Sequence, residues 1–445
     1  MSTEGIRIDN ALDGIKLCKW HIFLLTWIGI IYMFAAMNLL FIGLAIPAVS
    51  GEFSLNTFQQ SIIISGSFIG MFIGAGASGF VADHIGRKKA IILFFAVMEI
   101  FMIITAGSWD WQSFFVFRIF TGIGIGAVIP LSFVYLSEFI PSSERGKILV
   151  LLDGFWALGW ILAALEGYVI IPTQGWRLYF IAGGMGIVMF PFTFRIPNSP
   201  RYLLIQGKEE QTRKIVNKIR VSAGAAPIDA RLYTPEEAKI KIKTLWTKEY
   251  RRRTVLAWAM WFCMVYGYYS IFMWITNIMI RQYHYPLPVA LSNAMLSSFS
   301  QLPGYFVAAW LVDVVGRKKT LISFLTLGGI SVWIFIFTAH DPIGAILLLA
   351  IMGFFILGAW GVVMTYTTEL YPTALRGRGY GSASGFGRFA GIIGPYIVGA
   401  IIETVGIPAA LTISGIAFIV NAILIALLGV ETKLKSLEET GKPEQ

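Results

Sequence analysis

Long apolar runs constrain this chain more than any other feature of its sequence. They fall at about residues 22–46, 60–82, 90–107, 112–137, 148–171, 178–194, 255–280, 288–311, 320–339, 343–367, 380–402 and 407–430. A helix needs roughly 20 apolar residues to cross the hydrocarbon core of a bilayer. Hydrophobic residues make up 56% of the chain and charged residues 13%, whereas soluble domains carry about 25% charged residues. We therefore expect an all-α membrane protein with twelve transmembrane helices.

One long polar segment divides the expected helices into two sets of six. This division predicts a polar N-tail (1–21), a first six-helix bundle (22–194), a connector (195–254), a second six-helix bundle (255–430) and a C-tail (431–445). Within the connector, RYLLIQGKEEQTRKIVNKIR has apolar residues at helical spacing, which indicates an amphipathic helix lying at the membrane surface.

The positions of the cationic residues predict the orientation of the chain. Of the 35 Lys and Arg residues, 31 lie in the two tails, the connector and the even-numbered turns. Cationic loops face the cytoplasm, so both termini and the connector are expected there, in a cell (cytoplasmic) membrane. The net charge of +10 is explained by this orientation, and the lipid bilayer rather than nucleic acid is the expected partner.

Charged turns recur at a fixed distance along the chain. DHIGRKK at 83–89 returns as DVVGRKK at 313–319, and SEFIPSSERGK at 137–147 is matched by TELYPTALRGR at 368–378. The sequence therefore predicts two parallel copies of a six-helix unit. Such repeats are typical of carriers that rock around a binding site near the bilayer midplane, where the halves meet.

These motifs carry a resemblance to a known family. GFVADHIGRKK resembles the signature of the major facilitator superfamily, although Ala309 stands where the second copy would have its first glycine. LLDGFWALGWILAALEGYVIIP, LGAWGVVMTYTTELYPTALRGRGYG and SGFGRFAGIIGPYIVG are similar to the metabolite:proton symporter group, which includes nicotinate carriers and synaptic-vesicle-glycoprotein relatives. The resemblance extends over about residues 20–440 and implies a secondary transporter related to the sugar porters.

The resemblance gives the charged turns a role in conformational change. It implies a network that latches the outward-facing state, formed by Asp83, Arg87, Glu138, Arg145, Asp313, Arg317, Glu369 and Arg376. The alternative explanation is orientation by cationic loops, with tight turns at Gly86 and Gly316. Both explanations can hold together. Exposed ion pairs contribute only about 0–1 kcal/mol each, so a latch would need several of them.

Few charges lie well inside the expected spans, and each needs a partner or a function there. Arg388 is the one in the second half, and its planar guanidinium suits a carboxylate. In the organic-ion branches an arginine at this point resembles an anion-site residue. Two interpretations stay open, because Arg388 could bind a substrate anion or pair with Asp153 or Glu99.

Proton coupling has several candidate residues. In the sugar-porter pattern, the arginine that corresponds to Arg118 pairs with a proton-accepting aspartate in the first span, but Asn38 stands at that place. Asparagine cannot take up a proton, and facilitative sugar carriers also have it there. If coupling exists, Asp153, Glu99 or Glu166 must carry it. The symporter-like stretch LLDGFWALGW favours Asp153.

The remaining motifs indicate close helix packing and aromatic residues that could line a substrate site. Gly66, Gly70 and Gly74 repeat every four residues, which favours close helix packing, and TGIGIG lacks the preceding strand of a dinucleotide site. Trp156, Tyr269 and Trp360 are candidate walls for an aromatic or apolar substrate, and Asn38 is a further binding candidate.

We therefore expect a non-enzymatic, monomeric transporter without metal or cofactor. It would move a small organic anion, a monocarboxylate with a possible aromatic ring, together with H+ by alternating access. One alternative is a sugar or polyol carrier or a facilitative uniporter, because of Asn38. Another is a sensor on the same fold that does not transport.

Overall fold

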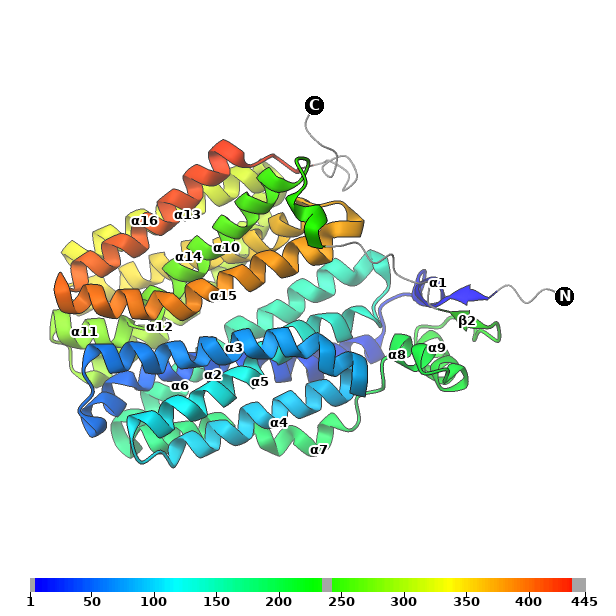
Figure 1. Ribbon diagram of the computed structural model, residues 1–445, viewed down its shortest axis with the longest axis horizontal. Coiled ribbons are helices and arrows are strands. Elements are labelled where there is room, and N and C mark those ends of the chain that lie inside the picture. The colour runs from blue at the N-terminus through cyan, green and yellow to red at the C-terminus, as the bar shows by residue number, and fades with distance from the viewer. Residues whose placement is uncertain (1–4, 234–241, 434–445) are drawn as a thin grey trace.

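The computed structural model describes residues 5–233 and 242–433. The first half contains α2 (Lys19–Phe53), α3 (Thr57–Ile85), α4 (Arg87–Ala106), α5 (Trp111–Ser137), α6 (Ser142–Gly183), the 3-10 helix η1 (Gly184–Met189) and α7 (Phe190–Thr193). The second half contains α10 (Arg251–Phe272), α11 (Ile275–Tyr283), α12 (Leu287–Val315), α13 (Arg317–Thr338), α14 (Pro342–Glu369), α15 (Thr373–Thr404) and α16 (Ile407–Leu428). Figure 1 shows the first half below the second, with long helices running in similar directions.

Membrane-length helices account for most of the described residues. Ten helical segments there are long and apolar enough to cross a membrane. One of them, Ser142–Thr193, is 52 residues long and holds two helices joined at Gly175, whose φ of 81° is not helical. A further helix, α12, has 29 residues and contains the buried polar side chains Asn293 and Gln301. The described chain therefore provides the twelve expected membrane-length passages.

The two copies of the charged turn have the same backbone geometry. Gly86 ends α3 with a φ of 91°, and Gly316 ends α12 with a φ of 100°. Glycine adopts positive φ without the steric cost that a side chain would bring. The next residue, Arg87 or Arg317, begins the following helix in each copy. The expected tight turns are present at both positions.

Glycines hold α3 against α5 at backbone contact distance. A Cβ atom added to Gly70 would lie 2.0 Å from the carbonyl oxygen of Ile119, and one added to Gly74 would lie 2.0 Å from that of Ile123. In the other direction, a Cβ atom on Gly122 would lie 2.2 Å from the carbonyl oxygen of Ser67. The glycine repeats of both segments are therefore packing surfaces, as small residues commonly are between membrane helices.

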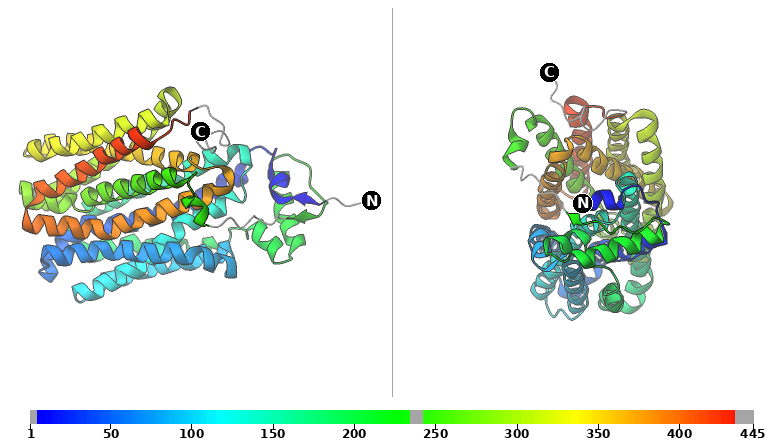
Figure 2. Two further views of the ribbon diagram at one scale, coloured as in Figure 1. Left: turned by 45° about the horizontal axis from the view of Figure 1, so that its top comes forward. Right: turned by 90° about the vertical axis from the view of Figure 1, so that its right-hand side faces the viewer.

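Shorter elements gather at one end of the helices, which we call the connector face (Figures 1 and 2). They are β1 (Ile6–Arg7), α1 (Ile8–Leu12), α8 (Pro200–Ile205), α9 (Glu209–Ser222), β2 (Leu232–Tyr233) and the 3-10 helix η2 (Ile242–Trp246). β1 and β2 pair in parallel, with Ile6 opposite Leu232, and are an exception to the expected all-α structure. The single amphipathic helix expected in the connector is two helices, because the chain turns at Gly207 with a φ of 71°.

The N-terminal segment is fastened to the connector by charge. Asp9 accepts a hydrogen bond of 2.5 Å from Arg201, and Arg220 donates to the carbonyl oxygen of Ala11 at 2.8 Å. Burial raises the pKa of the Asp9 carboxyl, but the hydrogen bonds from Arg201 and Arg7 oppose it and leave this pKa below its ordinary value. The carboxylate of Asp9 is therefore held in its charged form.

The α3–α5 contact gives a first prediction. Gly70→Ala should destabilise the fold by about 1–3 kcal/mol, because its new methyl group would overlap the backbone of Ile119. Thermal unfolding of the purified protein measures this effect. Gly76→Ala on the same helix is the matched control, since no atom lies within 4 Å of its added Cβ. Equal unfolding temperatures for the two variants would contradict the packing argument.

Candidate functional site

The two halves meet along two pairs of helices, α3 with α15 and α6 with α12. Figure 1 shows α3 and α15 lying side by side at the boundary between the halves. Ser65 on α3 donates to the carbonyl oxygen of Ile392 on α15 at 2.8 Å. Side chains from both halves line this boundary, so it is the place to look for a site that both can contact.

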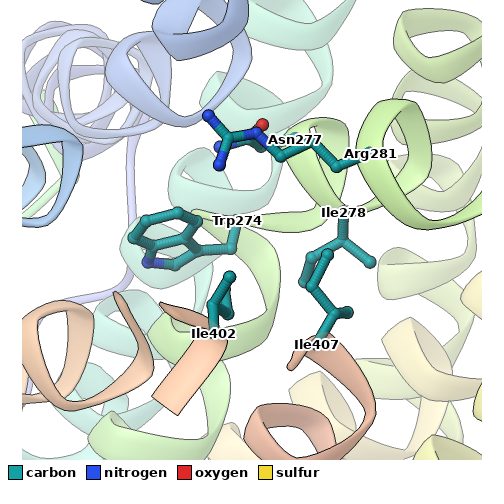
Figure 3. Close-up of a pocket in the computed structure, with 6 residues that line it drawn as sticks. All are labelled: Trp274, Asn277, Ile278, Arg281, Ile402 and Ile407. Atoms are coloured by element: carbon teal, nitrogen blue, oxygen red, sulfur yellow. The ribbon is translucent and has the colours of Figure 1, made fainter. Parts of the chain in front are cut away.

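Polar contacts join the halves at the end opposite the connector face, which we call the far face. Asn277 donates to Gln60 at 2.6 Å, and both side chains are buried. Arg281 donates to the hydroxyl of Thr57 at 3.0 Å. Figure 3 shows Asn277 and Arg281 beside Trp274 in a small pocket that is closed off by α15 and α16 side chains. The far face is therefore closed in this conformation.

Arg388 on α15 lies half-buried at the boundary. Its guanidinium lies within electrostatic range of the Tyr269 and Tyr380 hydroxyls. Within residues 5–233 and 242–433, Arg388 has no hydrogen bond and no carboxylate at ion-pair distance. An internal pair with Asp153 or Glu99 is therefore not formed among the described residues.

Asp153 faces the same region from α6. The hydroxyl of Tyr32 donates to its carboxylate at 3.1 Å. Tyr305 on α12 and Tyr380 on α15 also lie within electrostatic range of this carboxylate. Tyr380 and Tyr269 are near both Asp153 and Arg388. A cation of the second half and an acid of the first half therefore share the same tyrosine-lined space.

Aromatic rings surround this space. Trp156 packs against Tyr32, with ring centres 5.4 Å apart. Trp360 lies 6.1 Å from Tyr269, and Tyr269 meets Phe68 of the first half at 4.7 Å. The three aromatic residues expected to form a wall thus lie on α6, α10 and α14 around Asp153 and Arg388, and the rings of both halves contact each other.

The Asn38, Glu99 and Arg118 side chains form a separate, fully buried network in the first half. Asn38 donates to the carboxylate of Glu99 at 3.1 Å. Arg118 donates to the backbone carbonyl of Asn38 at 2.8 Å and to the hydroxyl of Ser67 at 3.1 Å. Asn38 stands where the sugar-porter pattern has the partner of this arginine, and the two residues are in contact. Asn38 therefore links the acid and the arginine through its side chain and its backbone carbonyl.

Charged groups of the first half assemble at the connector face. Arg87 lies 3.4 Å from the Glu138 carboxylate and 3.5 Å from that of Asp83. Glu138 is buried and also accepts a hydrogen bond from Ser199. Burial raises the pKa of the Glu138 carboxyl above its ordinary value, although the bond from Ser199 and the charge of Arg87 act in the opposite direction.

The second half repeats this assembly. Arg317 lies 3.1 Å from Glu369 and 3.9 Å from Asp313. Thr432 donates to Glu369 as Ser199 does to Glu138. In each half, the buried tyrosine three residues before the glutamate donates to a backbone carbonyl oxygen. Tyr135 donates to the carbonyl oxygen of Pro197 at 2.6 Å, and Tyr366 to that of Val430 at 2.7 Å.

Two further residues of the expected network have different surroundings. Arg145 donates to the carbonyl oxygen of Ile140 at 3.4 Å and is not seen within ion-pair distance of Glu138 among the described residues. Arg376 lies within electrostatic range of Glu369. Each glutamate therefore pairs with the arginine that follows the turn glycine of its own half. This arginine lies far from the glutamate in sequence.

Sequence reasoning missed several residues of these clusters. Tyr32, Tyr305 and Tyr380 surround Asp153, although nothing in their local sequence separates them from packing aromatics. Ser199 and Thr432 were detectable, because each follows the sixth helix of its half within a polar stretch. The Gln60–Asn277 bond spans 217 positions and joins two different halves, so only the fold reveals it.

Comparisons with known proteins agree with this architecture. The family profile described as "Sugar (and other) transporter" matches residues 24–442. The niacin transporter NiaP of Acinetobacter baylyi is 33% identical over 98% of this chain and 99% of its own length. The putative niacin/nicotinamide transporter NiaP of Bacillus subtilis is 32% identical over 92% of this chain and 96% of its own. The synaptic vesicle 2-related protein of Xenopus laevis is 28% identical over 99% of this chain.

Solved structures of the xylose transporter XylE from E. coli share the fold. The inward open conformation superposes with a TM-score of 0.73 at 17% identity, over 94% of this chain and 99% of XylE. The family match covers nearly the whole chain, and the two six-helix halves are those of a major facilitator fold. The chain therefore belongs to the sugar (and other) transporter family of the major facilitator superfamily, whose members are membrane transporters and not enzymes.

Proposed function

We propose that this protein carries a small aromatic monocarboxylate, with nicotinate as the first candidate, across the cell membrane by alternating access coupled to H+. The observation that carries the proposal is Arg388, an arginine at the boundary of the halves without a carboxylate partner in the described chain. A charge inside a membrane protein needs compensation. A substrate carboxylate can supply it through two parallel hydrogen bonds to the guanidinium.

The surroundings of Arg388 suit an aromatic body on that carboxylate. Tyr269 and Trp360 pack edge to face beside it, and Trp156 faces the same space from the first half. Aromatic pairs gain from such arrangements beyond the area that they bury. Two relatives with similarity over nearly the full chain are named for niacin, which is an aromatic carboxylate. Their names support the same class of substrate here.

Asp153 is the proposed proton-binding group. It lies at the boundary with the Tyr32 hydroxyl donating to it at 3.1 Å, in range of residues that also neighbour Arg388. Substrate at Arg388 and a proton at Asp153 would then bias the same closure of the two halves. Glu99 is the alternative acid, although it is fully buried in the first half and accepts a hydrogen bond from Asn38.

The division of contacts between the two faces supports alternating access. The far face is closed by Gln60–Asn277 and Thr57–Arg281, which hold the two halves together. The charged assemblies of the connector face instead lie within each half. Opening the far face would require the polar bonds there to break. The cationic residues of the connector face favour its placement in the cytoplasm.

A facilitated carrier is the second candidate, because Asn38 cannot release or accept a proton as an aspartate would. Arg118 is bonded to the Asn38 carbonyl, Ser67 and Met102 in this structure. If the chain uses no proton, the substrate would move down its gradient through the same site. The dependence of accumulation on a pH gradient separates the two functions.

Replacing Arg388 by lysine tests the anion site. Arg388→Lys keeps the charge but loses the planar fork, so nicotinate affinity should fall roughly 10–100-fold, as for a lost bond to a charged group. Calorimetric titration of the purified protein measures the affinity. Arg378→Lys on the same helix should bind as the unchanged protein does. Normal nicotinate binding by Arg388→Lys would reject Arg388 as the anion site.

Replacing Asp153 by asparagine tests the coupling. In proteoliposomes, Asp153→Asn should retain exchange of internal for external substrate but lose accumulation driven by a pH gradient, because the proton carrier is gone while the anion site remains. Glu166→Gln, a half-buried acid farther along α6, should keep both activities. Accumulation by Asp153→Asn would refute the role of this residue. A lack of proton dependence in the unchanged protein would favour facilitated diffusion.

Neutralising the connector-face acids tests the conformational role. Glu138→Gln should slow substrate exchange more than Asp83→Asn, because Glu138 is buried between Arg87 and Ser199 whereas Asp83 is largely exposed. Equilibrium binding should stay close to that of the unchanged protein, since neither residue contacts the proposed site. Complete loss of affinity in a folded Glu138→Gln protein would contradict this separation of gating from binding.

A further inference from the structure

A cavity of about 480 Å³ lies at the connector face, away from the boundary between the halves, and its interpretation does not depend on the proposed function. Its lining combines apolar and cationic side chains: Trp20, Phe23, Arg195, Pro197, Ile215 and Lys218. No transport role or motif of the sequence accounts for this combination. It therefore calls for a ligand with both an anionic and an apolar part.

The cavity lies where two membrane helices leave the bilayer. Trp20 and Phe23 are in the first turns of α2, which begins at Lys19, and Arg195 follows the end of α7 at Thr193 by two residues. Ile215 and Lys218 belong to α9, which packs against this end of α2. The level of the cavity is therefore that of the lipid headgroups.

The two cations of the cavity are available to an external anion. Arg195 and Lys218 are exposed, and neither has a carboxylate at ion-pair distance in the part of the chain that the structure describes. The Arg195 guanidinium lies over the Phe192 ring, 5.2 Å from its centre. This contact fixes one side of the guanidinium against an aromatic surface and leaves its edge for hydrogen bonds.

An aromatic surface leads from the cavity along the membrane helices. Phe23 contacts Trp27 with ring centres 6.1 Å apart, and Trp27 stacks on Phe192 at 5.7 Å. Phe23 is 41% and Phe192 37% exposed in the protein alone. Because these rings lie on the outer surface of α2 and α7, the surroundings that cover them in a membrane are acyl chains.

We propose that this cavity binds an anionic phospholipid, with its phosphate between Arg195 and Lys218 and an acyl chain along Phe23 and Phe192. Cations at a membrane surface favour anionic lipids, and aromatic side chains favour the interfacial level. A soluble phosphate could use the two cations but would leave the aromatic surface unused. The bound lipid would connect the first membrane helix to α9 of the connector.

Native mass spectrometry of the protein released from lipid nanodiscs tests this site. The unchanged protein should retain phosphatidylglycerol in preference to phosphatidylcholine. The double variant Arg195→Gln/Lys218→Gln should lose this preference by about fivefold for each cation removed. Lys208→Gln/Lys248→Gln removes two exposed cations outside the cavity and should retain phosphatidylglycerol normally. Equal thermal unfolding of both variants excludes misfolding as the cause.

Two further measurements identify the source of the anion. Phe23→Ser keeps both cations and should still weaken retention of phosphatidylglycerol, because the acyl contact is reduced. Glycerol phosphate and inorganic phosphate, added to the detergent-solubilised protein, should bind much more weakly than the lipid. The proposal is overturned if these soluble anions bind as tightly, or if Arg195→Gln/Lys218→Gln retains phosphatidylglycerol as the unchanged protein does.

Discussion

The cost of placing a charge in a low-dielectric interior determines how this molecule is arranged. Glu99 and Arg118 are fully buried, and each has hydrogen-bond partners in the first half: Asn38 donates to one Glu99 oxygen, and Arg118 donates to Ser67 and to the Asn38 carbonyl. Arg388 is different, because the described residues offer it neither a carboxylate nor a hydrogen bond. An arginine without compensation costs stability inside a membrane protein. The fold retains it half-buried at the boundary of the halves, and under the proposed function a substrate anion bound there would link binding to the approach of the two halves.

The repeated assemblies at the connector face make each half a unit that can move as one body. In both copies, a tyrosine and a hydroxyl side chain fasten the segment after the sixth helix. The arginine after the turn glycine meets a glutamate at the end of the fourth helix. These bonds lie within a half, whereas Gln60–Asn277 joins one half to the other. Motion between the halves therefore need not disturb the packing inside them, and the contacts that must change are those across the boundary, both polar and aromatic.

Much of the fold could be predicted, because it depends on local and periodic properties of the sequence. The apolar runs gave the twelve passages, and the recurrence of DHIGRKK and DVVGRKK gave the two copies with their glycine turns. The pairing of Arg87 with Glu138, and the tyrosines around Asp153, could not be predicted. They depend on which helices lie side by side, and one sequence contains no record of that. The β1–β2 pair was missed because two residues per strand leave no periodic pattern.

The β1–β2 pair and the contacts of η2 have a mechanical consequence. The connector up to Tyr233 is fastened to the N-terminal segment and the first half by β pairing and by Asp9–Arg201. The chain from Ile242 onward belongs to the second half, where Leu245 accepts a hydrogen bond from Thr254 and Trp246 packs on Trp258. One anchored end therefore follows the first half and the other follows the second, so movement of the halves relative to each other must change the distance between Tyr233 and Ile242.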